Sequence, residues 1–493
     1  MSDESEILDY SEPIECDVAI AGATYGGMAA GAILARSGKR VVIGDTPPVI
    51  GGRGGSQLYR GYWIDAGHRA GRDTTDMQAT VDFSADAARE AGVELRIAPV
   101  LRGLRIHLVP GSASESPRVL KELDWGVEGF SEMAVDAFGC RPGVVGSFVD
   151  AITELGNASE QDREAAKETP LGTWLETNIS EPSVKTAILN MVKSLYSEFP
   201  ERASLGRLMD MMTIFSDRQT VGSSQSGLPD DEEVGGMGGM IAPFTRAFEA
   251  AGGRIILDHE PSHVTFSGER ATGLVALSPN HFILRIRSQQ TILAWPVWDA
   301  LKMLPGERID PKLAEISRQL EDHKAIAMGW AVGLNRLPKI RETGETESFD
   351  GWNRLLVGVE REFSGGFHLP SLGSRRAAPE GKHLLHCMIM RWVRRDEERP
   401  WDVLEATLER ARNYLHHYYS DLEDCIDWHA DQYIRRPAMT GWYWAPVKRH
   451  GVEVTNCENL YLAGATVESN AGPSEISVHG GLMAARKILK SSR

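Results

Sequence analysis

The chain of 493 residues carries a formal net charge of −16, and 42% of its residues are hydrophobic. Two or three domains are expected, because a single hydrophobic core rarely serves so long a chain. The acidic balance argues against a nucleic-acid surface, which needs clustered Lys and Arg. It also argues against electrostatic docking on anionic lipid, but it leaves peripheral apolar contact with a membrane open.

Cysteine usage and the N-terminus favour a cytoplasmic location. Five cysteines are scattered along the chain without a Cys-x-x-Cys pair, a pattern typical of reduced thiols. The start of the chain, MSDESEILDYSEPIE, lacks the basic residues and apolar core of a secretory signal. The longest apolar run, residues 325–334, is too short to span a bilayer, and the histidines lack the spacing of a metal site.

The stretch DVAIAGATYGGMAAGAILARSGKRVVIGD, residues 17–45, predicts a strand, a tight turn, a helix and a second strand. Asp45 follows the second strand at the spacing of an acid that binds an adenosine ribose. Thr24 replaces the glycine that usually lets the backbone approach a pyrophosphate. It would either crowd a phosphate or donate its hydroxyl to one. The alternative interpretation is an ordinary strand–helix turn of an α/β protein.

Two glycine-rich turns follow, one directly downstream and one far along the chain. GGRGGS contains Arg53, whose guanidinium could bind phosphate oxygens, and YWIDAG predicts a strand that ends before Gly67. Further on, Gly235-Gly236 is expected to open an amphipathic helix. The apolar face of this helix would consist of Met240, Ile241, Phe244 and Phe248.

The C-terminal segment predicts another strand, turn and helix. NLYLAGA is typical of a buried strand, SNAGP of a turn, and Ser474 to Leu489 of a helix. The N-terminus of such a helix favours an anion, because the helix dipole places partial positive charge there.

Taken in order, the segments AGATYGG, VVIGD, GGRGGS, YWIDAG, GGMGGMI, NLYLAGA and AGPSEISVHGGLMAA resemble the FAD-dependent amine oxidase and phytoene desaturase superfamily. The resemblance covers both ends and the middle of the chain. The amine oxidase branch usually has an acid in place of Ala465, so the Gly464-Ala465 pair leans toward the phytoene desaturase branch. Thr24 departs from both branches.

The resemblance implies bound FAD and a set of contacts to it. They are Gly22, Thr24, Gly26 and Gly27 at the pyrophosphate, Asp45 at the adenosine ribose, Gly52 and Arg53 at the diphosphate, Gly67 near the flavin, Val264 at the adenine through its backbone, and Gly464, Ala465, Gly472, Ser474 and Ile476 at the ribityl chain and ring.

The expected fold is α/β (α+β overall), with a discontinuous Rossmann-like FAD-binding domain and an inserted substrate domain of mixed sheet and helices. The FAD-binding domain would comprise residues 1–100, 228–297 and 440–493, and the substrate domain residues 101–227 and 298–439. Within the substrate domain, helices are expected over 170–199, a central strand over 323–337, and an amphipathic helix over 401–419.

Candidate catalytic residues are His68, Tyr443 and Trp444. His68 could act as an acid or base near neutral pH, or it could simply bond to cofactor or backbone. If residues 442–444 form a strand, alternation would turn Tyr443 toward the substrate cavity and the tryptophans away from it. Core packing of these aromatics is the competing interpretation.

The leading hypothesis is an FAD-dependent dehydrogenase or desaturase that acts on an apolar small molecule by hydride transfer to flavin N5. Three alternatives remain: a flavin-dependent amine oxidase, a redox-neutral flavin-dependent isomerase, and a non-catalytic binding or escort protein on the same fold. The sequence leaves the substrate, the final electron acceptor and the oligomeric state open.

Overall fold

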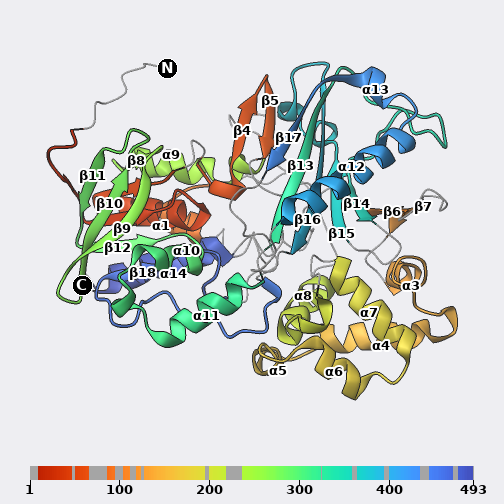
Figure 1. The fold of residues 1–493 in the computed structure, drawn as a ribbon, viewed down its shortest axis with the longest axis horizontal. Helices are drawn as coiled ribbons and strands as arrows, with labels where there is room; N and C mark the ends of the chain where they lie inside the picture. Colours follow the sequence, from red (N-terminus) through yellow and green to blue (C-terminus); the bar gives the residue numbers. More distant parts are fainter. Residues whose placement is uncertain are drawn as a thin grey trace.

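The computed structural model describes most of the chain. It covers residues 9–46, 50–65, 86–94, 104–110, 118–123, 127–194, 199–217, 236–323, 325–357, 363–392, 399–433, 443–469 and 476–491. Figure 1 shows three parts: a layered part that contains β1 and α14, the first and last described elements, a second sheet flanked by a long helix, and a group of helices beneath that sheet.

A five-stranded parallel sheet forms the centre of the layered part. Its order is β18-β12-β2-β3-β8, with bounds Leu460–Leu462, Gln290–Leu293, Val18–Ala21, Val41–Gly44 and Arg254–Ile256. The strands β2, β3 and β18 are buried at every residue, as expected for parallel strands that are covered on both faces. All four pairings are parallel, so the carboxyl ends of the five strands lie along one edge.

Helices cover one face of this sheet, and an antiparallel sheet covers the other. The helices are α1 (Tyr25–Arg36), α9 (Ala242–Ala250) and α14 (Ile476–Ser491). The antiparallel sheet has the order β1-β11-β10-β9, with bounds Ile14–Glu15, Ile283–Arg287, Arg270–Leu277 and Glu260–Ser267. Alternate side chains of β2, such as Ile20 and Ala21, enter the two cores that result.

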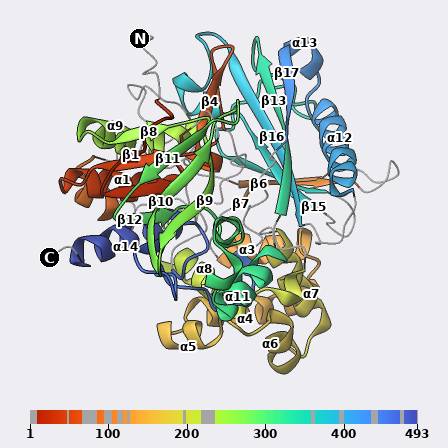
Figure 2. The ribbon, with the colours of Figure 1, turned by 60° about the vertical axis from the view of Figure 1, so that its left-hand side comes forward.

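A seven-stranded sheet forms the second part. Its order is β17-β13-β16-β15-β14-β6-β7, with bounds Ile426–Tyr433, Ala325–Leu334, His383–Trp392, Phe363–His368, Trp352–Val357, Leu104–Val109 and Arg118–Leu123. The long helix α12 (Pro400–Tyr418) packs its apolar residues on one face of the sheet. Figure 2 shows α12 beside β13, β15 and β16.

The third part is helical. It comprises α3 (Val127–Asp136), α4 (Val145–Gly156), α5 (Glu160–Ala165), α6 (Leu171–Asn178), α7 (Pro182–Ser194) and α8 (Leu205–Asp217). Pro170 and Pro182 stand at the starts of α6 and α7, where a missing backbone N–H costs nothing. The remaining elements are the hairpin β4–β5 (Ser56–Tyr59 and Tyr62–Asp65) and the helices α10 (Val297–Ala300), α11 (Pro311–Glu321) and α13 (Leu422–Cys425).

The expected fold class is confirmed: a Rossmann-like parallel sheet combines with a separate mixed sheet and helices. The strands of the two large sheets come from the segments that we assigned to the two domains, while the domain boundaries themselves stay a prediction. The helix expected to open at Gly235-Gly236 was placed too early. Its α-helical part begins at Ala242, after a 3-10 turn over Gly236–Met240. The four apolar residues expected on one face are all buried.

Candidate functional site

The carboxyl edge of the parallel sheet gathers the glycine-rich segments that are far apart in sequence. The backbone N–H of Gly51 donates to the Ala23 carbonyl at 2.6 Å, which joins the first two motifs. The backbone N–H of Gly26 donates to Ser477 Oγ at 3.0 Å, which joins the N-terminal turn to the last helix. The N-termini of α1 and α14 therefore converge, and their dipoles add positive potential at this edge.

Two glycines of the first turn are required by close packing. A Cβ atom on Gly27 would lie 1.9 Å from the Gly22 carbonyl oxygen, so only glycine lets the helix approach the strand. Gly22 itself has a φ of +110° and lies under the Trp295 indole, 2.8 Å from where a Cβ would stand. This arrangement matches the packing role of the glycines in a dinucleotide-binding turn.

Thr24 uses its hydroxyl within the protein. It is the N-cap of α1, and Oγ1 accepts from the Gly27 N–H at 3.3 Å. The same hydroxyl donates to the Ala294 carbonyl at 2.9 Å. Its single proton thus bonds to the strand end after β12, and both roles that we considered for Thr24 toward a phosphate, crowding it or donating to it, stay predictions.

Asp45 lies at the end of β3 and is 1% exposed. Its carboxylate accepts from the backbone N–H of Ala23 at 2.8 Å and from that of Thr46 at 2.8 Å. The Asp45 carboxylate therefore stabilises the first turn by hydrogen bonding to its backbone. The predicted contact of Asp45 with the adenosine ribose stays a prediction.

The second turn lies against the first through an aromatic ring. A Cβ atom on Gly54 would lie 2.7 Å from the Tyr25 ring, and the Tyr25 hydroxyl donates to the Gly54 carbonyl at 3.1 Å. Gly52 has a φ of +57° and faces the methyl group of Thr24. The backbone of Arg53 belongs to this turn, while its side chain lies outside the described part.

The C-terminal motif packs against the same edge. A Cβ atom on Gly464 would lie 1.9 Å from the Trp295 carbonyl oxygen, and one on Gly26 would lie 2.2 Å from that of Ala463. Ile476 is fully buried at the start of α14, and Ala465 is 8% exposed. Val264 lies on the edge strand β9 with a buried side chain, and its adenine contact stays a prediction.

These residues fit the diphosphate of a dinucleotide such as FAD. Ser477 accepts from the Gly26 N–H, which leaves the Ser477 hydroxyl proton able to donate to an anion between the two helix N-termini. Ser477 was not predicted from the sequence, because a serine inside a helical segment carries no pattern of its own. The glycines, Asp45 and Ser477 would hold the cofactor's phosphates and ribose at this edge.

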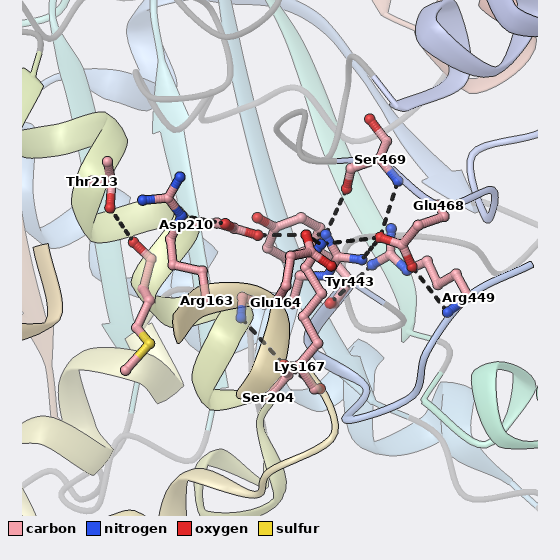
Figure 3. A network of polar contacts seen from close by, with 12 residues as sticks. Arg163, Glu164, Lys167, Ser204, Asp210, Thr213, Tyr443, Arg449, Glu468 and Ser469 are labelled. Atoms are coloured by element: carbon pink, nitrogen blue, oxygen red, sulfur yellow. Dashed lines mark hydrogen bonds and ion pairs between the residues drawn. The ribbon is translucent and has the colours of Figure 1, made fainter. Parts of the chain in front are cut away.

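A buried network of charges links this edge to the helical part (Figure 3). Arg207 on α8 is 1% exposed and binds Glu468 Oε1 at 2.8 Å and the Ser469 carbonyl at 2.6 Å. Lys167, which is 3% exposed, lies 3.2 Å from the same carboxylate oxygen. The backbone N–H of Arg449 donates to Glu468 Oε2 at 3.0 Å.

Glu468 is the hub of this network. Burial alone would raise the pKa of its carboxyl, but the charges on Arg207, Arg449 and Lys167 outweigh burial and lower the pKa to about 2. Ser469, the next residue, bonds through Oγ to His479 Nδ1 on α14 at 2.7 Å. The network thereby connects α8 with the start of the last helix. Sequence analysis did not single out Glu468.

Tyr443 and Trp444 lie in this region but not in a strand. Residues 443 and 444 belong to none of the described sheets, so the expected strand alternation is wrong here. Both side chains are buried, at 0% and 1% exposure, with their rings 5.2 Å apart. The Tyr443 ring lies near the guanidinium groups of Arg207 and Arg449, at 5.7 Å and 5.5 Å. Their catalytic roles stay predictions.

Several predicted site residues lie outside the described residues: Gly67, His68, Gly472 and Ser474. Trp442, which was expected to face away from the cavity, also lies outside them. Within the described ranges, no three His, Cys, Asp or Glu side chains gather as a metal site. In the same ranges, no helix is long and apolar enough to cross a membrane. The five cysteines are buried and free.

Comparisons with known proteins show the fold. No family model matches the chain, and no curated protein matches it in sequence. An oxidoreductase from Methanosarcina mazei is similar in structure, with a TM-score of 0.63, 16% identity, and coverage of 96% of this chain and 100% of that one.

Two amine-oxidising proteins share the fold. A variant of putrescine oxidase matches with a TM-score of 0.63 and 13% identity, over 97% of this chain and 100% of that one. Cyclohexylamine oxidase from Brevibacterium oxydans matches with a TM-score of 0.59 and 16% identity, over 97% and 100%.

Proposed function

We propose that the chain is an FAD-dependent oxidoreductase that acts on a small organic molecule. The observation that carries the proposal is the convergence of two helix N-termini and two glycine-rich turns on the carboxyl edge of a parallel sheet. In open α/β sheets, ligands bind in the crevice beyond this edge. When bound, FAD supplies a hydride acceptor.

The residues of the chain hold and orient the cofactor. The N-termini of α1 and α14 would meet the negative charge of the diphosphate, and Asp45 would accept from the adenosine ribose. Arg207 of the helical part donates to the backbone carbonyl of Ser469, and the Ser469 side chain bonds to His479 on α14.

Two substrate classes follow from different features. The Gly464-Ala465 pair supports dehydrogenation or desaturation of an apolar molecule, as in the phytoene desaturase branch. The shared fold with putrescine oxidase and cyclohexylamine oxidase supports oxidation of an amine.

Acid denaturation followed by identification of the released flavin tests the cofactor. Anaerobic bleaching of the flavin with amines, terpenoids and cyclic enones then tests the reaction without the natural electron acceptor. We expect released FAD and bleaching by one of these classes. Release of NAD would overturn the proposal of FAD. No flavin after growth with ample riboflavin would favour the binding or escort protein instead.

A further inference from the structure

One face of the seven-stranded sheet has an unusual composition. The residues of β13 that face away from α12 are all small: Ala325, Ala327, Gly329, Ala331 and Gly333. Two histidines lie beside them on neighbouring strands, since Ala331 pairs with His386 and His386 pairs with His368. A strip of small residues flanked by buried polar groups is therefore present opposite α12.

The glycines of this strip let side chains of the edge strand β17 lie flat across β13. A Cβ atom on Gly329 would lie 2.9 Å from Gln432 Oε1 and 3.4 Å from His386 Nε2. Gln432 thus reaches over β13 to a histidine two strands away. The Nε2 atom of the same Gln432 amide donates to the backbone carbonyl of Asp65, at the end of β5, over a distance of 3.1 Å.

This contact determines which nitrogen of His386 carries the proton. A carbonyl oxygen only accepts, so the bond to Asp65 fixes the Gln432 amide with its NH₂ group toward β5. The Gln432 oxygen then faces His386 Nε2 at 2.5 Å and must accept from it. His386 is consequently held in the tautomer with hydrogen on Nε2, and Nδ1 is an acceptor.

The acceptor nitrogen of His386 is not used by the described residues. His386 is 2% exposed, and Nδ1 has no hydrogen-bond partner in the part of the chain that the structure describes. Burial lowers the pKa of the imidazole, against the opposing effects of the Asp65 charge and the Gln432 bond, which keeps the ring neutral at pH 7. An acceptor that the described residues leave unused can take a hydrogen bond from a donor on a bound molecule.

We propose that His386 Nδ1 accepts a hydrogen bond from a small molecule bound on this face, and that it selects compounds with an N–H or O–H group over compounds with only a carbonyl. Gln432 is the positioning residue, because it fixes the tautomer. The proposal rests on the proposed function for its view of the ligand as a substrate, and it narrows that substrate to an amine or alcohol.

Calorimetric titration with cyclohexanol and cyclohexanone tests the selection, because the two probes share a ring and differ in their hydrogen-bonding group. We expect cyclohexanol to bind at least about tenfold more tightly, since a site built around a polar group rejects the analogue that leaves it unpaired. Cyclohexylamine serves as a third probe. Equal affinities for the alcohol and the ketone, or no binding of any probe, would overturn the proposal.

The variant Gln432→Met tests the tautomer. We expect the nitrogen NMR signals of His386 to report hydrogen on Nε2 alone in the native protein and a mixture of tautomers in Gln432→Met, with loss of most of the preference for cyclohexanol. His429→Asn, on the exposed side of the same strand, is the matched control and should keep the preference. Unchanged His386 signals in Gln432→Met would contradict the proposal that Gln432 fixes the tautomer of His386.

These measurements separate the inference from the proposed function. Both report binding or protonation rather than activity, and the NMR experiment on the native protein does not depend on the folding of a variant. A clear preference for cyclohexanol in a protein that releases no flavin would leave the His386 site standing and remove the oxidoreductase. Released FAD without any preference would do the reverse.

Discussion

At the scale of single residues, Thr24 shows how one side chain can replace a glycine without abolishing the turn. A sequence pattern shows that Thr24 replaces the usual glycine, but it does not show in which direction the threonine side chain points. The structure turns the hydroxyl inward, where it caps α1 and binds the Ala294 carbonyl. Helix capping therefore accounts for a threonine at this position, and a contact of Thr24 with a phosphate stays a prediction.

We expect Thr24→Ala to lower the free energy of unfolding by about 1 kcal/mol, because the N-cap acceptor is lost, and Thr24→Gly to cost only a few tenths. Thr24→Ser, which keeps the hydroxyl, is the control. Urea denaturation measures all three, and released flavin is quantified in parallel. Loss of flavin from Thr24→Gly with unchanged stability would show that the hydroxyl is a phosphate ligand after all.

Tyr443 carries a second expectation at this scale. Its ring is fully buried near two guanidinium groups and packs on Trp444. Tyr443→Ala should therefore destabilise the protein by about 3–5 kcal/mol, as truncation of a buried aromatic does. Tyr443→Phe keeps the ring and should cost much less. A stable Tyr443→Ala variant in thermal or urea unfolding would return Tyr443 to the role of a cavity residue.

At the scale of elements, the contact between α1 and α14 depends on the absence of side chains. A Cβ atom on Gly481 would lie 2.1 Å from the Gly26 carbonyl oxygen. Because this oxygen belongs to the backbone, it could move away only by shifting a helix. We expect Gly481→Ala to cost about 1–3 kcal/mol by overpacking. Gly146→Ala in α4 is the matched control, because nothing lies within 4 Å of the new atom. That variant should be neutral or slightly stabilising, since alanine favours helix. Equal midpoints for the two variants in urea would contradict the tight contact.

Most helices and strands could be predicted from the sequence, but the elements that each of them contacts could not. The all-apolar run of β13 and the amphipathic pattern of α12 predict a buried strand and a surface-packed helix, and both are present. The parallel pairing of β14 with β6 joins residues such as Leu355 and His107, which lie far apart in the chain, and no local pattern encodes it. The tautomer of His386 likewise depends on Gln432 and Asp65, which come from two other strands.

At the scale of the whole molecule, the buried charges around Glu468 tie the helical part to the layered part. Without the Glu468 carboxylate, the buried Arg207 guanidinium would keep only Asp210, at 3.5 Å, as an ion-pair partner among the described residues, and a buried charge that loses a partner is destabilising, whereas a pair in water contributes little. The hub carboxylate is more acidic in the folded chain, with a pKa of about 2, than the ordinary value of 4.5. The unfolded chain therefore binds more protons between these values, so stability falls as the pH falls through this window.

We expect this carboxylate to contribute about 2–3 kcal/mol near neutral pH, after allowance for its partial exposure, and to lose that contribution between about pH 4.5 and pH 2. Glu468→Gln should consequently be destabilised at pH 7, and its deficit relative to the native protein should shrink as the pH falls through 4.5. Glu176→Gln removes a surface pair with Lys185, in which the glutamate side chain is 77% exposed, and should change stability by under about 1 kcal/mol at either pH. Urea unfolding at pH 7, 4.5 and 3.5 measures both variants. A deficit of Glu468→Gln that stays constant across these values would mean that the carboxylate acts through hydrogen bonds that glutamine cannot copy, and not through its charge.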